Sequence, residues 1–284
     1  MTQWRNKLGV GLAVKVGVYV VLGLLGVFLF AQVLMFVGGD AWYLLASVLG
    51  VFAAATVANA VVMRIYERGR LADIGFAWNS ASVRNLLLGL GGGIVGAALV
   101  LGGPLLAGCA ELSKTLQSGG SLVFLLVLLL FGAIGEEMLF HGYGFQVLLG
   151  ALGPWATILP VSCLFAWAHS SNLGVSPLGL ANTAGWGVVL GYAFWRSGDL
   201  WLPIGLHVGW NWTLPPFGAT LSGFRMNVTG YAMNWKIGPL WSGGEYGPEA
   251  GVLTSGVLVV LFVYLLKAPI RHQDAFLLRA RGEA

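Results

Sequence analysis

Apolar residues run through most of this chain in long stretches that polar residues interrupt at only a few places. Most stretches approach the length of about 20 residues that a helix needs to cross the hydrocarbon core of a bilayer. Glycine, proline and polar residues typical of turns separate them. The pattern predicts eight membrane-spanning helices over residues 16–37, 42–63, 86–110, 121–149, 154–169, 177–195, 201–215 and 252–266.

Composition supports this interpretation. Hydrophobic residues make up 57% of the 284 residues and charged residues only 9%, and the mean hydropathy is +0.82. A soluble domain is typically about a quarter charged. We therefore predict an all-α fold, a polytopic helical bundle of about eight transmembrane helices, in which residues 1–284 form one integral membrane domain.

Basic residues occur near the ends of the predicted spans. By the positive-inside rule these regions face the cytoplasm, which predicts cytoplasmic N- and C-termini and an even number of spans. Because the cations lie at helix ends, the net charge of +4 does not indicate a nucleic-acid partner. We expect an integral protein of a prokaryotic cytoplasmic membrane. The basic residues are Arg5, Lys7, Lys15, Arg64, Arg68, Arg70, Arg84, Lys267, Arg271, Arg279 and Arg281.

Two adjacent carboxylates follow the apolar run at residues 121–134, inside the fourth predicted span, in the sequence GEEMLFHGYG. Charge inside hydrocarbon is costly, and acids within membrane segments are usually paired, hydrated or functional. On a helix Glu137 and His141 are four residues apart and share a face, whereas Glu136 points about 100° away. We therefore expect different roles for the two acids, with Glu137 paired to His141.

Two further histidines stand at helical spacing from an aromatic or polar residue. Phe165 precedes His169 by four residues in FAWAH, and His207 precedes Asn211 by four in HVGWN. The fourth and fifth stretches turn near residues 150–153, which places Glu136 and His169 roughly 21–24 Å from that turn. The same arithmetic places His207 and Asn211 roughly 12–18 Å deep. We expect these side chains to meet in one layer of the bilayer.

These residue types are the components of a peptide hydrolase. A carboxylate and an imidazole can hold a water molecule and take its proton. A second imidazole and an amide can donate hydrogen bonds to the oxyanion of a tetrahedral intermediate. Such a site needs no serine or cysteine nucleophile.

The motifs EEMLFH, FAWAH and HVGWN resemble those of the intramembrane glutamic proteases of the CAAX-protease and bacteriocin-processing family, namely EExxxR, FxxxH and HxxxN. The run SGDLWLPIGLHVGWNW also resembles the family's approach to its third motif, and ERGRLADIGF resembles the segment before its third helix. The resemblance covers residues 123–212, the predicted catalytic core. Three motifs in the family's order make the resemblance specific.

The resemblance implies a metal-independent intramembrane endopeptidase without a cofactor, acting on a membrane-associated protein or peptide. Glu136 and His169 would then activate the water, and His207 and Asn211 would form the oxyanion hole. Nothing in the sequence predicts a prenyl group on the substrate.

The first motif differs from the family's pattern at one position that is expected to be structural. Glu137 and Phe165 match family positions, but His141 replaces the family's arginine. The pair with Glu137 would then be a histidine–glutamate hydrogen bond, whose charge depends on pH as an arginine's does not.

Other functions are compatible with the same residues. Glu136, His169 and His207 could bind zinc in a zinc protease, although the HExxH motif is absent. The fold could also serve a non-proteolytic immunity or scaffold protein, or a transporter with a proton relay. The histidines could individually be core residues bonded to backbone carbonyls, and Asn211 could join two helices.

Two segments outside the spans are long enough to form structure of their own. They are the connector at residues 64–82 and the glycine- and tryptophan-rich residues 217–251. The second segment could lie in the membrane interface or cap a cavity. Asp199, at the turn before the seventh span, is expected to be an ordinary charge at a helix end.

Overall fold

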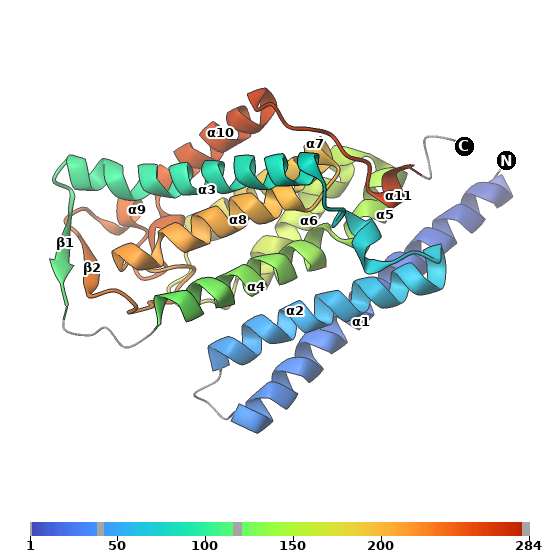
Figure 1. The fold of residues 1–284 in the computed structure, drawn as a ribbon, viewed down its shortest axis with the longest axis horizontal. Helices are drawn as coiled ribbons and strands as arrows, with labels where there is room; N and C mark the ends of the chain where they lie inside the picture. The colour runs from blue at the N-terminus through green and yellow to red at the C-terminus, as the bar shows by residue number, and fades with distance from the viewer. Residues whose placement is uncertain (1, 39–42, 116–120, 280–284) are drawn as a thin grey trace.

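The computed structural model describes residues 2–38, 43–115 and 121–279, and helices make up most of them (Figure 1). The α-helices are α1 (Thr2–Gly38), α2 (Tyr43–Val62), α3 (Ser80–Leu106), α4 (Leu122–His141), α5 (Tyr143–Leu152), α6 (Pro154–Ala168), α7 (Pro177–Ser197), α8 (Trp201–Thr213), α9 (Pro239–Ser242), α10 (Val252–Lys267) and α11 (Phe276–Arg279). The short turns are η2 (Met63–Glu67), η3 (Leu71–Ile74), η4 (Pro215–Phe217) and η5 (Pro248–Ala250), and the strands are β1 (Ala110–Lys114) and β2 (Tyr231–Trp235).

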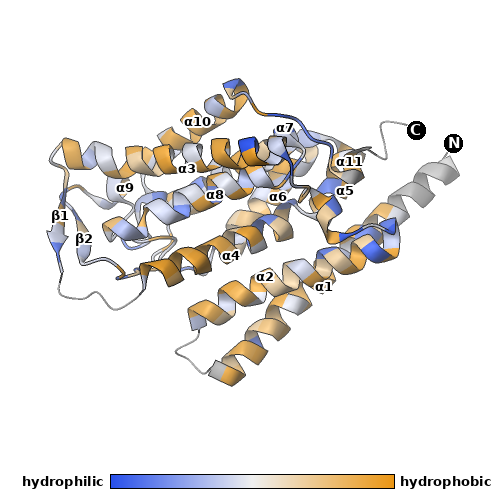
Figure 2. Ribbon diagram, in the orientation of Figure 1, coloured by the Kyte–Doolittle hydropathy of each residue, from blue (hydrophilic) through white to orange (hydrophobic). Residues whose placement is uncertain are grey.

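Several helices have the length and composition of membrane spans. Four segments qualify: Gly11–Val37, Tyr43–Glu67, Ser80–Leu106 and Leu122–Leu152. Figure 2 shows them hydrophobic along most of their length. The chain is an integral membrane protein, as predicted. Eight spans are not confirmed, because α6, α8 and α10 have 15, 13 and 16 residues, fewer than the roughly 20 that a span needs.

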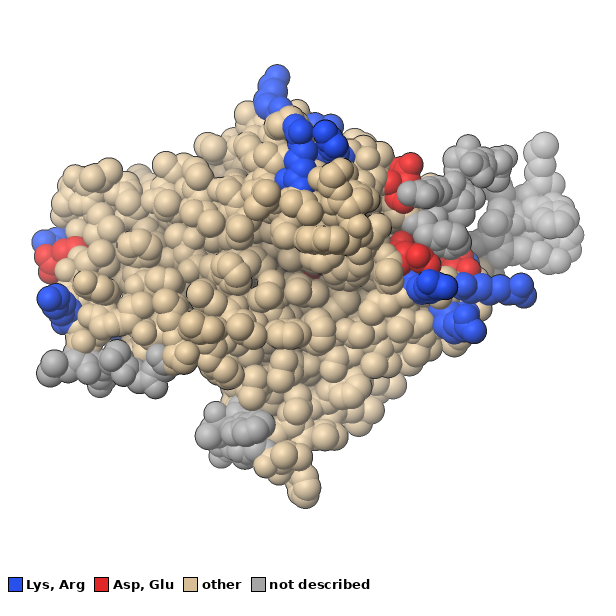
Figure 3. Space-filling model, viewed as in Figure 1, with Lys and Arg blue, Asp and Glu red and all other residues tan. Residues whose placement is uncertain are grey.

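On the face of the molecule seen in Figure 3, the charged side chains that the structure describes lie in a few places. Figure 3 shows Lys and Arg gathered where α2 ends, where α3 begins and α10 ends, and beside the β1–β2 sheet. The face between these groups is free of charge in this view. This pattern fits a protein embedded in lipid. The predicted cytoplasmic position of the termini stays a prediction, since Arg281 and the side chains of Arg5, Lys7 and Arg279 lie outside the described residues.

Helices α3 and α8 pack backbone against backbone through facing glycines. A Cβ atom at Gly89 or Gly93 would overlap the carbonyl oxygen of Leu202 or Leu206, and α8 glycines approach α3 in the same way. Small residues allow such close approach between membrane helices. The glycine-rich composition of α3 thus serves tight packing, and it holds α8 inside the bundle (Figure 1).

A methyl group at this interface is expected to be destabilising. Gly93→Ala should lower the free energy of unfolding by about 1–3 kcal/mol, because its Cβ would overlap the α8 backbone. Gly91→Ala is the matched control, since its Cβ meets nothing within 4 Å and alanine favours a helix by about 0.5–1 kcal/mol over glycine. Thermal unfolding of both variants in one detergent measures the difference. A Gly93→Ala protein as stable as Gly91→Ala would contradict the packing.

The predicted fourth span, residues 121–149, is interrupted. Helix α4 ends at His141 and α5 begins at Tyr143, because Gly142 departs from helical geometry with φ −75° and ψ −143°. Asn59 of α2 fills the break: its Oδ1 accepts from the Tyr143 backbone N–H at 2.8 Å, and its Nδ2 donates to the Met138 carbonyl at 3.0 Å. A buried amide from another helix therefore satisfies the backbone groups at the point where α4 ends, directly after His141. Spacing within one segment cannot reveal such a contact.

Residues 217–251 fold back onto the bundle. Strand β2 pairs antiparallel with β1, with Ala110 opposite Trp235 and Lys114 opposite Tyr231. The all-α prediction missed this two-stranded sheet, because its strands are more than 100 residues apart in the chain. The predicted third span, residues 86–110, was placed too late in the chain, since α3 runs from Ser80 to Leu106 and β1 follows at Ala110.

Asp199 is a buried anchor rather than an ordinary surface charge, so that expectation was wrong. Its Oδ1 accepts from the backbone N–H groups of Trp201 and Leu202 at 3.1 and 3.2 Å, and its Oδ2 accepts from Asn85 Nδ2 at 2.8 Å and from Gln273 Nε2. These contacts satisfy free N–H groups at the start of α8. They also fix α8 to α3 and to the segment after α10.

Candidate functional site

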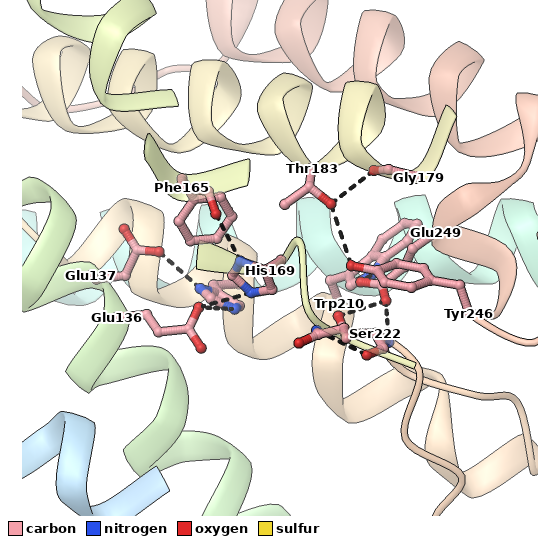
Figure 4. Close-up of polar contacts among 12 residues, drawn as sticks. Glu136, Glu137, Phe165, His169, Gly179, Thr183, Trp210, Ser222, Tyr246 and Glu249 are labelled. Carbon is pink, nitrogen blue, oxygen red and sulfur yellow. Dashed lines mark hydrogen bonds and ion pairs between the residues drawn. The ribbon is translucent and has the colours of Figure 1, made fainter. Parts of the chain in front are cut away.

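Glu136 faces two histidines from different helices. Its Oε2 lies 3.8 Å from His169 Nε2 and 3.9 Å from His207 Nε2, and Figure 4 shows Glu136 pointing toward His169. These separations are longer than a direct hydrogen bond. Glu136 Oε2 is buried and has no hydrogen-bond partner among the described residues. The predicted convergence of Glu136, His169 and His207 is therefore present.

Glu137 is fully buried and binds two histidines at once. Its Oε2 lies 2.7 Å from His141 Nδ1 and its Oε1 lies 2.8 Å from His207 Nδ1. The predicted pair with His141 is confirmed, and the bond to His207 is new. Because a carboxylate only accepts, Nδ1 of each histidine carries the donated proton. Glu137 thereby sets the orientation of the His207 ring and turns Nε2 toward Glu136.

His169 ends α6 and is oriented by Phe165, one turn earlier. The ring Nδ1 donates to the Phe165 carbonyl at 2.8 Å, so Nε2 is left facing Glu136. The Phe165 ring packs edge to face on Phe140, with centroids 5.0 Å apart, and lies 4.7 Å from the His169 ring. Phe165 is buried, which agrees with a packing role. His169 therefore makes the backbone hydrogen bond that was considered as an alternative to a functional role, and the same ring also faces Glu136.

Asn211 lies one turn after His207 on α8, in the same layer. Its half-buried side chain makes no hydrogen bond to the residues that the structure describes. The amide is therefore not occupied in joining two helices within those residues. Its N–H groups are free to bind a ligand on the face of α8 that carries His207.

No metal centre stands out in the cluster. Among residues 2–38, 43–115 and 121–279, no group of three or more His, Cys, Asp and Glu side chains has the arrangement of a metal site. The zinc-ligand set considered from the sequence places Glu136 Oε2 3.8 Å from His169 Nε2 and 3.9 Å from His207 Nε2.

A second group of polar residues, which sequence reasoning missed, lies beside this cluster. Glu249 of η5 is buried and accepts from Trp210 Nε1 at 3.0 Å and from Ser222 Oγ at 2.8 Å. Figure 4 shows His169 between Glu136 and this group. Burial raises the pKa of Glu249 above its ordinary value, an effect that its donors partly offset. No motif marked Glu249, since it stands in a loop sequence, GPEAG.

The comparison with protein families bears on this segment. Residues 118–213, roughly a third of the chain, match the family described as type II CAAX prenyl endopeptidase Rce1-like. This segment is therefore similar to the Rce1-like family. The match begins just before α4 and ends with α8, so it includes Glu136, His169, His207 and Asn211. No curated protein and no solved structure matches the chain.

The family match confirms the resemblance seen in the three motifs. The description of the matched family, a type II CAAX prenyl endopeptidase, agrees with the kind of protein that the motifs predict. Residues 217–251, which supply Glu249 and Ser222, lie outside the matched segment.

Proposed function

We propose that this protein is an intramembrane endopeptidase of glutamic type, which hydrolyses a peptide bond with an activated water molecule. The observation that carries the proposal is the position of Glu136 Oε2, a buried acceptor less than 4 Å from both His169 Nε2 and His207 Nε2. Polar groups at this separation are commonly joined by water. The Rce1-like match over the same residues supports it.

The hydrogen-bond pattern suits Glu136 and His169 for binding this water. In neutral His169, Nδ1 donates to the Phe165 carbonyl, so Nε2 can only accept. A water molecule between two acceptors donates both its hydrogens and directs its oxygen lone pair outward. Glu136 would take one proton as the oxygen attacks the carbonyl carbon, and later deliver it to the leaving amine.

His207 and Asn211 would stabilise the oxyanion that forms. Because His207 Nδ1 donates to Glu137, its Nε2 can donate only when the ring is doubly protonated. Glu136 and Glu137 both favour that cation by charge. The free amide of Asn211 adds a neutral donor. Removing one such donor from an oxyanion hole typically costs 10²–10³ in kcat.

The substrate would be a protein or peptide that reaches the site from the membrane. The charge-free face seen in Figure 3 and the four apolar segments support a chain embedded in lipid. We place the protein in a prokaryotic cytoplasmic membrane, with both termini in the cytoplasm, because basic residues lie near the predicted inner ends of the spans. The proposal does not specify whether the substrate carries a lipid, and the experiment described next tests lipidated and unlipidated peptides.

Oxygen labelling tests the reaction. Purified protein is incubated with lipidated and unlipidated membrane-peptide libraries in H₂¹⁸O, and the products are identified by mass spectrometry. Attack by water predicts one ¹⁸O atom in the new carboxyl terminus of a product of single turnover. Cleavage without ¹⁸O, or no cleavage by protein shown to be folded, would contradict the proposal.

Zinc dependence is the second candidate, because Glu136, His169 and His207 carry zinc-ligand atoms close together. We expect cleavage to be unchanged within twofold by 1,10-phenanthroline, with zinc well below one atom per chain by elemental analysis. Stoichiometric zinc, with activity lost to the chelator and restored by added zinc, would favour the metalloprotease instead.

A non-proteolytic scaffold is the third candidate, favoured by His141 in place of the family's arginine. Cells that depend on the protein discriminate the two. A protease predicts that Glu136→Gln fails to restore the phenotype of a deletion strain, whereas a scaffold predicts full restoration at equal expression.

A further inference from the structure

Glu249 is a buried carboxylate that the proposed chemistry does not use. Its Oε1 accepts from Trp210 Nε1, and its Oε2 accepts from both the hydroxyl and the backbone N–H of Ser222. No Lys or Arg pairs with it among the described residues. A buried charge without a cation is costly. The two oxygens of the Glu249 carboxylate can accept from all three donors. A glutamine amide in its place would have only one accepting oxygen, and its NH₂ group would face at least one of these donors.

One donor of Glu249 lies on α8, and the other lies in a segment that is bonded to the loop after His169. Trp210 stands between His207 and Asn211 on α8, and its ring packs on Trp186 with centroids 4.8 Å apart. Ser222 belongs to the segment after α8, and its carbonyl accepts from Asn172 Nδ2 at 3.0 Å. Asn172 lies in the loop that directly follows His169.

Further contacts tie the same pieces together. Gly223 donates its backbone N–H to the Tyr246 carbonyl at 2.9 Å and touches the backbone of Leu173 so closely that a Cβ would overlap it. The Glu249 carbonyl accepts from Asn182 Nδ2 of α7 at 2.8 Å. Glu249 is thus the point at which α8, the loop after His169 and the start of α7 are joined.

We propose that Glu249 is a positioning residue, which holds the His207–Asn211 face of α8 at a fixed distance from His169 through Trp210, Ser222 and Asn172. The inference rests on the proposed endopeptidase function, since it assigns residues 217–251 a part in the geometry of that site. It predicts that loosening Glu249 separates the water-activating side chains from the oxyanion donors. Misplacement of catalytic groups by about 1 Å can cost about 10²-fold in rate.

The first test compares four variants with the same substrate, well below their unfolding temperatures. Glu249→Gln and Trp210→Phe should each lower kcat about tenfold with KM within twofold, and the double variant should lose no more than either one. Trp212→Phe is the control: it removes an indole donor from the same helix, whose partner is the Leu126 carbonyl of α4, and kcat should stay within twofold. Wild-type kcat in Glu249→Gln, multiplicative losses in the double variant, or an equal loss in Trp212→Phe would overturn the proposal.

A second measurement is independent of proteolysis. Diethyl pyrocarbonate modifies histidine, and the rate at His169 follows from mass spectrometry. Glu249→Gln should raise this rate severalfold over wild type, while Trp212→Phe should not. An unchanged rate in Glu249→Gln would overturn the positioning role. A raised rate in Glu249→Gln, together with a folded wild-type protein that never cleaves peptides, would overturn the protease proposal alone. If Glu249→Gln does not fold, Ser222→Gly replaces it, because Ser222 has a glycine-like φ of +47° and loses only its hydroxyl donor.

Discussion

Replacement of Glu136 by glutamine is expected to lower kcat about 10³-fold and to leave the protein folded. Glutamine keeps the size of the side chain but cannot take a proton, and general-base catalysis contributes about 10²–10⁴-fold. The Glu136 side chain is 29% exposed and makes no direct hydrogen bond to the described residues. Its loss should therefore change the free energy of unfolding by no more than about 0.5 kcal/mol. Peptide cleavage and thermal unfolding of the same preparation measure both effects.

Glu245→Gln is the matched control for this prediction. Glu245 is exposed in the segment before α10 and belongs to neither polar group of the site. Its glutamine variant should retain kcat within twofold. Cleavage by Glu136→Gln at a rate similar to that of the control would remove Glu136 from the mechanism.

Loss of Glu137 is expected to damage both folding and catalysis. Glu137→Ala would leave Nδ1 of His141 and of His207 without their acceptor inside the protein. Breaking a buried charged pair costs about 3–5 kcal/mol, so the variant should unfold at a clearly lower temperature. The fraction that stays folded should lose about 10²-fold in kcat, because the proposed mechanism uses His207 as an oxyanion donor and Glu137 orients its ring.

An exposed acid serves as the comparison. Glu111 pairs with Lys236 at 2.6 Å on the β1–β2 sheet, and both side chains are more than half exposed. Surface pairs of this kind contribute about 0–1 kcal/mol, so Glu111→Ala should leave stability and kcat nearly unchanged. If Glu137→Ala unfolds at the same temperature as Glu111→Ala, the hydrogen bonds of Glu137 with His141 and His207 do not stabilise the bundle as we expect.

Patterns within single segments predicted much of the site. Helical spacing gave the Glu137–His141 pair and the separate direction of Glu136, since both depend on one helix. The turn near residues 150–153 is present, with α5 ending at Leu152 and α6 beginning at Pro154. Depth along the chain then brought His169 and His207 to the level of Glu136.

Contacts between segments were beyond these patterns. The hydrogen bond between Glu137 and His207 depends on how α8 is rotated about its axis relative to α4, and the spacing of residues in the sequence does not determine this rotation. The same holds for Asn59, which ends α4, and for the pairing of β1 with β2. Glu249 could not be predicted for a further reason. Its loop sequence has no periodicity, and the role proposed for it depends on its contacts with Trp210 and Ser222, which only the three-dimensional structure reveals.

Water placement tests the central claim most directly. An experimental structure at a resolution that shows ordered solvent should reveal a water molecule within about 2.7–3.2 Å of both Glu136 Oε2 and His169 Nε2, on the side facing His207 and Asn211. A metal ion in that position, or Glu136 bonded directly to a histidine with no water between them, would contradict the account.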